Sequence, residues 1–150
     1  MTGTARKRKR SGLALQGVSI DFVILADYAQ AVNGKLTLVG AGWNQHHAKQ
    51  YPATLLIGLG LGFLVPWAET NRRHKFEFVI KGSEGPESLI QGGGEFEVGR
   101  EAGTPVGMTQ RVSIGITAPL KVPEAGSYEV VVTVEGDEKR VGFEAIKPPT

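Results

Sequence analysis

The sequence predicts an all-β protein, an antiparallel β-sandwich of about eight strands. Residues 55–63 alternate large apolar side chains with glycine, and several later segments alternate apolar with polar side chains between turn-forming residues. No 10–15-residue amphipathic helix pattern alternates with these segments, which argues against a parallel α/β sheet. A chain of 150 residues is long enough to bury one sizeable core.

The alternation in residues 55–63 is the strongest evidence for a strand. Leucine, isoleucine or phenylalanine occupies every odd position, and Gly58, Gly60 and Gly62 lie between them. In a helix each glycine would cost roughly 1 kcal/mol relative to alanine, whereas a strand places the apolar side chains on one face. We expect that face to cover the core. The bare face is either filled by large side chains of the same chain or used for contact with a second copy.

The other elements follow in order along the chain. A first strand occupies residues 18–26, and Asn33-Gly34 is a strong turn pattern before a second strand from Leu36. Residues 44–52 are polar and are expected to form a loop, and proline favours a short helical turn near residues 66–71. Alternation predicts further strands near residues 76–81, 96–98, 112–116, 128–135 and 141–145. The alternation also predicts these buried core residues: Phe22, Leu38, Leu59, Phe78, Ile114, Val132 and Phe143.

The charge is divided between a basic arm and a mildly acidic body. Five consecutive cations give the first ten residues a charge of +5, and the other 12 basic residues stand against 15 acidic ones, which leaves −3. We expect residues 1–12 to be a disordered arm and residues 13–150 to be a single β-sandwich domain. The predicted polyanion-binding residues of the arm are Arg6, Lys7, Arg8, Lys9 and Arg10. The arm either binds nucleic acid non-specifically or is only a solvated tail.

Composition excludes several classes of site and predicts the compartment. The chain has no cysteine, so it cannot form a disulfide, a zinc–thiolate site or an iron–sulfur cluster by itself. Polar residues and glycine interrupt residues 13–25, so this segment does not resemble a signal peptide. The longest apolar run, near residues 55–65, is too short and too rich in glycine to span a bilayer. We therefore expect a cytoplasmic protein with no membrane contact.

No motif predicts catalysis or a cofactor. His46 and His47 are adjacent, and neighbouring residues of an extended segment point to opposite faces, so a solvated loop is expected there rather than a metal site. The sequence lacks a Gly-x-Ser-x-Gly elbow, and residues 92–94 lack the Lys-Ser/Thr of a phosphate loop. We expect a protein that is not an enzyme and that has no catalytic residue, metal or cofactor.

Two segments are candidates for contact with a partner. The corner from residue 67 to residue 74 combines Trp67, Glu69, Asn71 and His74 with two arginines. Asp27 and Tyr28 lie at the end of the first strand. Polar groups beside an aromatic ring can recognise a partner, but they can equally satisfy loose backbone groups at the end of a sandwich.

Three stretches resemble an uncharacterised family of small bacterial proteins, a domain of unknown function. The stretches are Leu25-Ala26-Asp27-Tyr28-Ala29 with Asn33-Gly34-Lys35-Leu36 and residues 40–43, then Val65-Pro66-Trp67 with Glu69, Asn71, His74 and Phe76, and finally Leu120, Val122-Pro123, Gly126 and Tyr128 before the last hairpin. The resemblance implies a compact β-domain encoded as a single small protein. It implies no activity, and the basic arm is an addition to it.

The sequence thus favours a non-enzymatic interaction module that binds a protein partner or forms a homo-oligomer. The alternative is a nucleic-acid-associated protein that acts through its basic arm.

Overall fold

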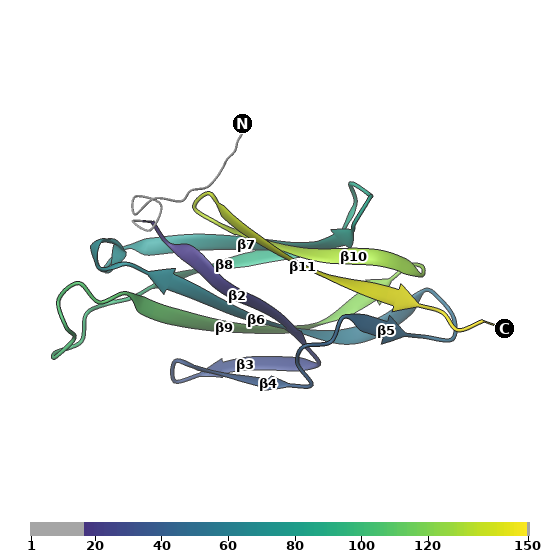
Figure 1. Ribbon diagram of the computed structural model, residues 1–150, viewed down its shortest axis with the longest axis horizontal. Helices are drawn as coiled ribbons and strands as arrows, with labels where there is room; N and C mark the ends of the chain where they lie inside the picture. Colours follow the sequence, from purple (N-terminus) through teal and green to yellow (C-terminus); the bar gives the residue numbers. More distant parts are fainter. Residues whose placement is uncertain (1–16, 150) are drawn as a thin grey trace.

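A computed structural model describes residues 17–149 of the chain, so the predicted arm over residues 1–12 lies outside the described residues. The described part is all-β, as predicted: ten strands form three sheets, with one 3-10 turn, η2 (Trp67–Glu69) (Figure 1). Over residues 17–149 no helix is long and apolar enough to cross a membrane.

The largest sheet has five strands in the order β5-β11-β10-β7-β8. Its pairs are antiparallel except for β5, which runs parallel to β11 over three residues. The bounds of its strands are β5 (Gln45–His47), β7 (Arg73–Gly82), β8 (Ser88–Glu97), β10 (Gly126–Val134) and β11 (Asp137–Ile146). Residues 45–47 were expected to lie in a loop, but they pair with the exposed edge of β11.

The second sheet has three antiparallel strands in the order β2-β6-β9, and a separate hairpin joins β3 to β4. The bounds are β2 (Ser19–Ala26), β3 (Tyr28–Val32), β4 (Lys35–Val39), β6 (Ala53–Val65) and β9 (Gln110–Val122). Figure 1 shows the hairpin as a third layer beneath the three-stranded sheet. Asn33 and Gly34 make its turn with φ of 53° and 75°, the left-handed region that this residue pair favours.

The core lies between the two larger sheets. The apolar side chains of β6 point into it, and Leu59, Leu61 and Phe63 are at most 1% exposed. Four predicted core residues are confirmed as buried: Leu59, Phe78, Val132 and Phe143. The prediction was wrong for Phe22, Leu38 and Ile114, which are only half-buried.

A β-bulge explains why Phe22 is outside the core. The register of β2 against β6 shifts between Ile20 and Phe22, so the alternation changes face at that point. Val18 and Ile20 face the core before the bulge, and Leu25 faces it after the bulge. Phe22 instead lies against Gly62 on the other face of the sheet.

The hairpin covers the bare face of β6 at Gly58 and Gly60, and Phe22 covers it at Gly62. A Cβ atom on Gly58 would lie 2.8 Å from the backbone of Tyr28, and one on Gly60 would lie 2.8 Å from the Leu38 side chain. These contacts agree with the intramolecular alternative for the glycine face. They also explain why Leu38 is only half-buried: it packs on glycine outside the core.

Candidate functional site

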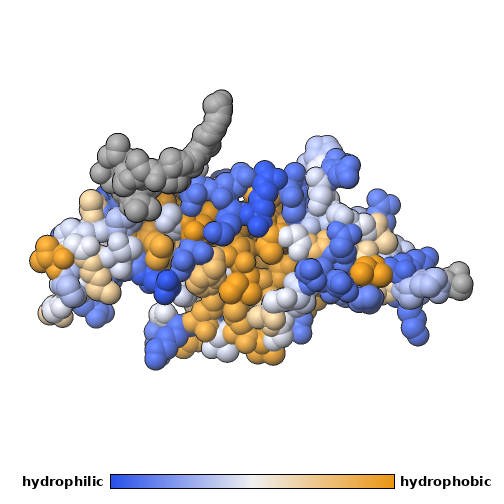
Figure 2. Space-filling model, viewed as in Figure 1, coloured by the Kyte–Doolittle hydropathy of each residue, from blue (hydrophilic) through white to orange (hydrophobic). Residues whose placement is uncertain are grey.

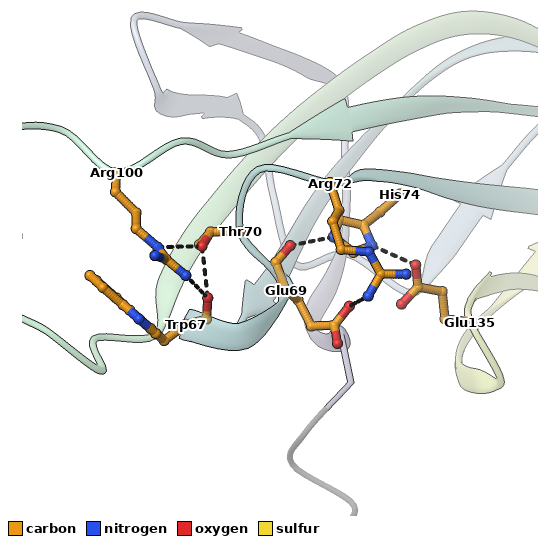
Figure 3. Close-up of polar contacts among 7 residues, drawn as sticks. All are labelled: Trp67, Glu69, Thr70, Arg72, His74, Arg100 and Glu135. Carbon is orange, nitrogen blue, oxygen red and sulfur yellow. Dashed lines mark hydrogen bonds and ion pairs between the residues drawn. The ribbon is translucent and has the colours of Figure 1, made fainter.

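The corner between β6 and β7 holds four of the six predicted partner-contact residues, and Figure 3 shows three of them, Trp67, Glu69 and His74. Pro66 fixes an extended approach with φ of −63°, and η2 follows directly. The amide of Glu69 donates to the Pro66 carbonyl at 2.9 Å, and the Thr70 hydroxyl donates to the Trp67 carbonyl at 2.7 Å. Asn71 has φ of 61°, which is tolerated by asparagine and turns the chain into β7.

Trp67 is clamped by an arginine from the segment after β8. The guanidinium carbon of Arg100 lies 3.9 Å from the centre of the Trp67 ring. The same guanidinium donates to the Thr70 hydroxyl at 2.7 Å and to the Trp67 carbonyl at 2.8 Å. Because the arginine occupies the ring face and holds the turn, these contacts favour a structural role for this face of Trp67.

His74 is the buried centre of the corner. Its side chain is fully buried, and its ring lies 5.6 Å from the ring of Phe96. Nε2 donates to the carbonyl of Glu69 at 2.8 Å, and Nδ1 lies 2.5 Å from a carboxylate oxygen of Glu135. An acceptor at each ring nitrogen favours the doubly protonated imidazolium, because only that form donates from both nitrogens.

The charge state of His74 follows from competing effects. Burial lowers its pKa, but the hydrogen bonds to Glu135 and Glu69 and the charges of both carboxylates together raise the pKa above the usual 6.5. Glu135 lies in the β10–β11 turn with φ of 46°, a conformation that a glutamate adopts only at a cost. Its contact with His74 offsets that cost and joins the β10–β11 hairpin to the corner.

Within residues 17–149, one histidine–carboxylate group has its potential metal ligands all within 4.8 Å of one another. It consists of Glu69, His74 and Glu135. Both nitrogens of His74 already carry hydrogen bonds within the protein, and Glu69 pairs with Arg72 at 3.0 Å. This arrangement fits an ion-pair network better than a metal site. His46 and His47 lie elsewhere, on β5.

The other two predicted partner-contact residues lie at the opposite end of β2. Ser19 pairs with Leu64 near the corner, whereas Ala26 pairs with Gly58 at the far end of the strand. Seven residue steps at about 3.3 Å each place Asp27 and Tyr28 roughly 20 Å from the corner. The structure therefore divides the six residues into two separate groups.

Tyr28 belongs to an exposed apolar surface that sequence reasoning missed. It lies directly opposite Val39 in the hairpin, and the two are 39% and 55% exposed. Val32, at the end of the same strand, is 50% exposed. We call Tyr28, Val32 and Val39 the hairpin face; in Figure 2 apolar surface gathers over the middle of the molecule and this hairpin. Weak alternation in residues 28–32 concealed the strand.

A shallow hollow of about 790 Å³ lies over the outer part of β7 and β8. Its lining includes Lys75, Glu77 and Glu95 together with the three glycines of β8. The two groups of predicted contact residues do not line it.

Comparison with known families now identifies the chain. The sequence profile of a family of unknown function (DUF6941) matches residues 21–142. The chain belongs to this family. This DUF6941 member gave no significant match among curated proteins or among solved structures. The predicted resemblance to a domain of unknown function is thereby confirmed, and the match starts beyond the basic arm.

Proposed function

We propose that this DUF6941 protein is a non-enzymatic interaction module that binds a protein partner through the hairpin face. The main support is the exposure of Tyr28, Val32 and Val39 on a hairpin whose other face is fixed to the sheet. An apolar surface held on a rigid support loses little conformational freedom when a partner covers it. Tyrosine is also among the residues enriched where proteins meet.

Two hydrogen bonds keep the hairpin face in place. The Ala29 amide donates to the hydroxyl of Thr117 at 2.9 Å, and that hydroxyl donates to the Ala29 carbonyl at 2.7 Å. Tyr28 donates from its own hydroxyl to the side chain of Gln30 at 3.0 Å, on the same outward face. The hairpin face therefore presents Tyr28 beside Val39, and the Tyr28 hydroxyl and the Gln30 side chain can form hydrogen bonds that orient a partner.

The test compares two valine substitutions. Val39→Glu places a charge on the hairpin face, and Val106→Glu places the same charge on a loop residue that is 87% exposed. Proteins that bind the wild-type chain and V106E but do not bind V39E are candidate partners. Each candidate is then purified, and its binding to the three chains is measured by titration calorimetry. We expect V39E to weaken such binary binding by at least tenfold. Equal binding by V39E and wild type would refute the role of the hairpin face.

The charge of the arm supports a second function, that of a nucleic-acid-associated protein. The arm carries five consecutive cations. In the described part of the chain Arg72, Arg73, Arg111 and Arg140 each pair with a carboxylate, so these body cations are locally balanced. If four or five arm cations contact duplex DNA, the logarithm of affinity should fall with the logarithm of salt at a slope of about −4.

Truncation separates the two functions. A chain beginning at Gly12 lacks the basic residues of the arm and keeps the hairpin face. We expect this truncated chain to lose weak, salt-sensitive binding to DNA or RNA and to keep its protein partner. Undiminished nucleic-acid binding by the truncated chain would show that the body, not the arm, binds the polyanion.

A further inference from the structure

The edge of β8 is open. Within residues 17–149, β8 has a strand neighbour only on the side of β7, and it is the last strand of the five-stranded sheet. Gly92 and Gly93, at its centre, are exposed. The backbone N–H and C=O groups along the other side of β8 therefore face outward as a template for a further strand.

β8 has few of the features that usually protect an edge. Charged side chains, above all lysine, as well as proline, a bulge or a short strand, normally prevent pairing; of the charged side chains β8 has only the exposed Glu95 and Glu97. Residues 88–97 contain neither lysine nor proline, and the irregularity against β7 occurs only at the start of β8, opposite Ile80 and Lys81. At the other end of the sheet the edge strand β5 has three residues. The two edges of this sheet are thus differently protected.

Half-buried apolar side chains lie beside this edge. β9 is an edge of the three-stranded sheet and lies near β8, and within the described residues no strand pairs with both edges. The half-buried residues of β8 and β9 that pack against the core are Leu89, Ile90, Phe96, Val112, Ile114 and Ile116. A strand added to β8 would cover part of this apolar surface, so pairing there would gain burial as well as hydrogen bonds.

We propose that β8 pairs antiparallel with β8 of a second copy, with the two-fold axis at Gly93, and joins two five-stranded sheets into one. In this register Ile90 faces Phe96 of the other copy, and Gln91 faces Glu95 of the other copy. The proposal specifies the self-association included in the module function, and it uses a surface separate from the hairpin face.

The sequence of β8 selects this register. Residues opposite each other across a two-fold axis must share a face, so the axis can pass through Gly92, Gly93 or Gly94 but not between them. An axis at Gly92 would place Phe96 opposite Ser88 and Ile90 opposite Gly94, so neither of these apolar side chains would face another large one. An axis at Gly94 would leave residues 88–90 without a partner within β8. Of the three axes, only the one at Gly93 places Ile90 opposite Phe96 and Gln91 opposite Glu95; Leu89 then lies opposite Glu97 at the ends of the paired segment.

The first test changes the charge of one exposed residue. Gln91→Glu would place like charges opposite Glu95 twice in the dimer, and Gln91→Lys would place opposite charges there. From cross-strand pair energies, we expect Q91E to raise the dimer Kd about 2- to 30-fold and Q91K to lower it by a similar factor. Sedimentation velocity on the full chain, from micromolar to millimolar concentrations, measures both values beside the wild type.

The second test uses the absence of cysteine from the chain. A Gln91→Cys, Glu95→Cys double variant should be cross-linked into dimers by a short bismaleimide, whereas Gln91→Cys alone should not. The β8 interface is overturned if the chain stays monomeric at all concentrations. It is also overturned if the dimer neither responds to the charge of residue 91 nor cross-links through this pair. V39E should leave the dimer intact, so failure of the hairpin face and failure of the β8 interface give different results.

Discussion

Replacing Gly58 with alanine should lift the hairpin from the sheet. A Cβ atom at this position would lie 2.8 Å from the carbonyl carbon of Tyr28 and 2.9 Å from the amide nitrogen of Ala29. Both contacts are with backbone atoms, which cannot rotate away as the end of a side chain can. The first residues of β3 must therefore move outward.

The expected loss of stability combines three contributions. Overpacking costs about 1–3 kcal/mol. Movement of β3 also breaks the two hydrogen bonds between Ala29 and Thr117, each contributing about 1 kcal/mol. Alanine offsets about 0.4–1 kcal/mol by restricting the unfolded chain. We expect Gly58→Ala to lower the free energy of unfolding by about 2–5 kcal/mol.

Urea unfolding with matched glycine variants tests this reasoning. A Cβ atom on Gly82 would meet open space, with nothing beyond its chain neighbours within 4 Å, and Gly82 has no positive φ. Gly82→Ala should therefore be neutral or stabilising by up to about 1 kcal/mol. Gly60→Ala should lie between the two because it meets side-chain ends of Leu38. Amide exchange should show lost protection in β3 for G58A only. Equal stability of G58A and G82A would refute the packing of the hairpin on β6.

Three other substitutions probe the corner, the core and a turn. Burial opposes the His74 cation, but the contacts with Glu135 and Glu69 raise the pKa of His74 in the folded protein. The stability that protonated His74 contributes should therefore be complete below the unfolded-state pKa. It should be lost as the pH rises through the folded-state pKa. Glu135→Gln should flatten this part of the pH profile of urea unfolding, and an unchanged profile would contradict the ion pair. Leu59→Ala, at a core residue that is 1% exposed, should cost about 2–5 kcal/mol by the same assay; a loss below about half a kcal/mol would contradict its core position. Tyr128→Phe removes a 2.7 Å hydrogen bond to the Glu124 carbonyl and should lower the free energy of unfolding by about 0.5–1.5 kcal/mol, whereas no loss would show that the bond adds nothing.

Strands with one face on the core could be predicted from the sequence because their side chains alternate with a period of two. The strand of residues 55–63 is the clearest case, and it lies within β6. β3 could not be found in this way. Its inner face rests on glycine and its outer face meets solvent, so neither face demands large apolar residues, and Tyr28–Val32 contains two alanines and a glutamine.

The contacts of the corner were beyond sequence reasoning for a different reason. Residues 67–74 were recognised as an unusual cluster, but His74 meets Glu135 across 61 positions of the chain, and Arg100 reaches Trp67 across 33. No local pattern encodes such distances. The bulge before Phe22 is a similar case, because one extra residue reverses the face of every side chain after it.

The two proposed interfaces reinforce each other through geometry. The hairpin face belongs to the layer outside the three-stranded sheet, and the β8 edge belongs to the five-stranded sheet. Pairing through β8 would therefore leave both hairpin faces free and present two of them, with two basic arms, on one particle. A partner or polyanion that engages both copies would then bind more tightly than either contact alone allows, because the second contact is intramolecular. Weak single contacts would thus suffice for a module of this size.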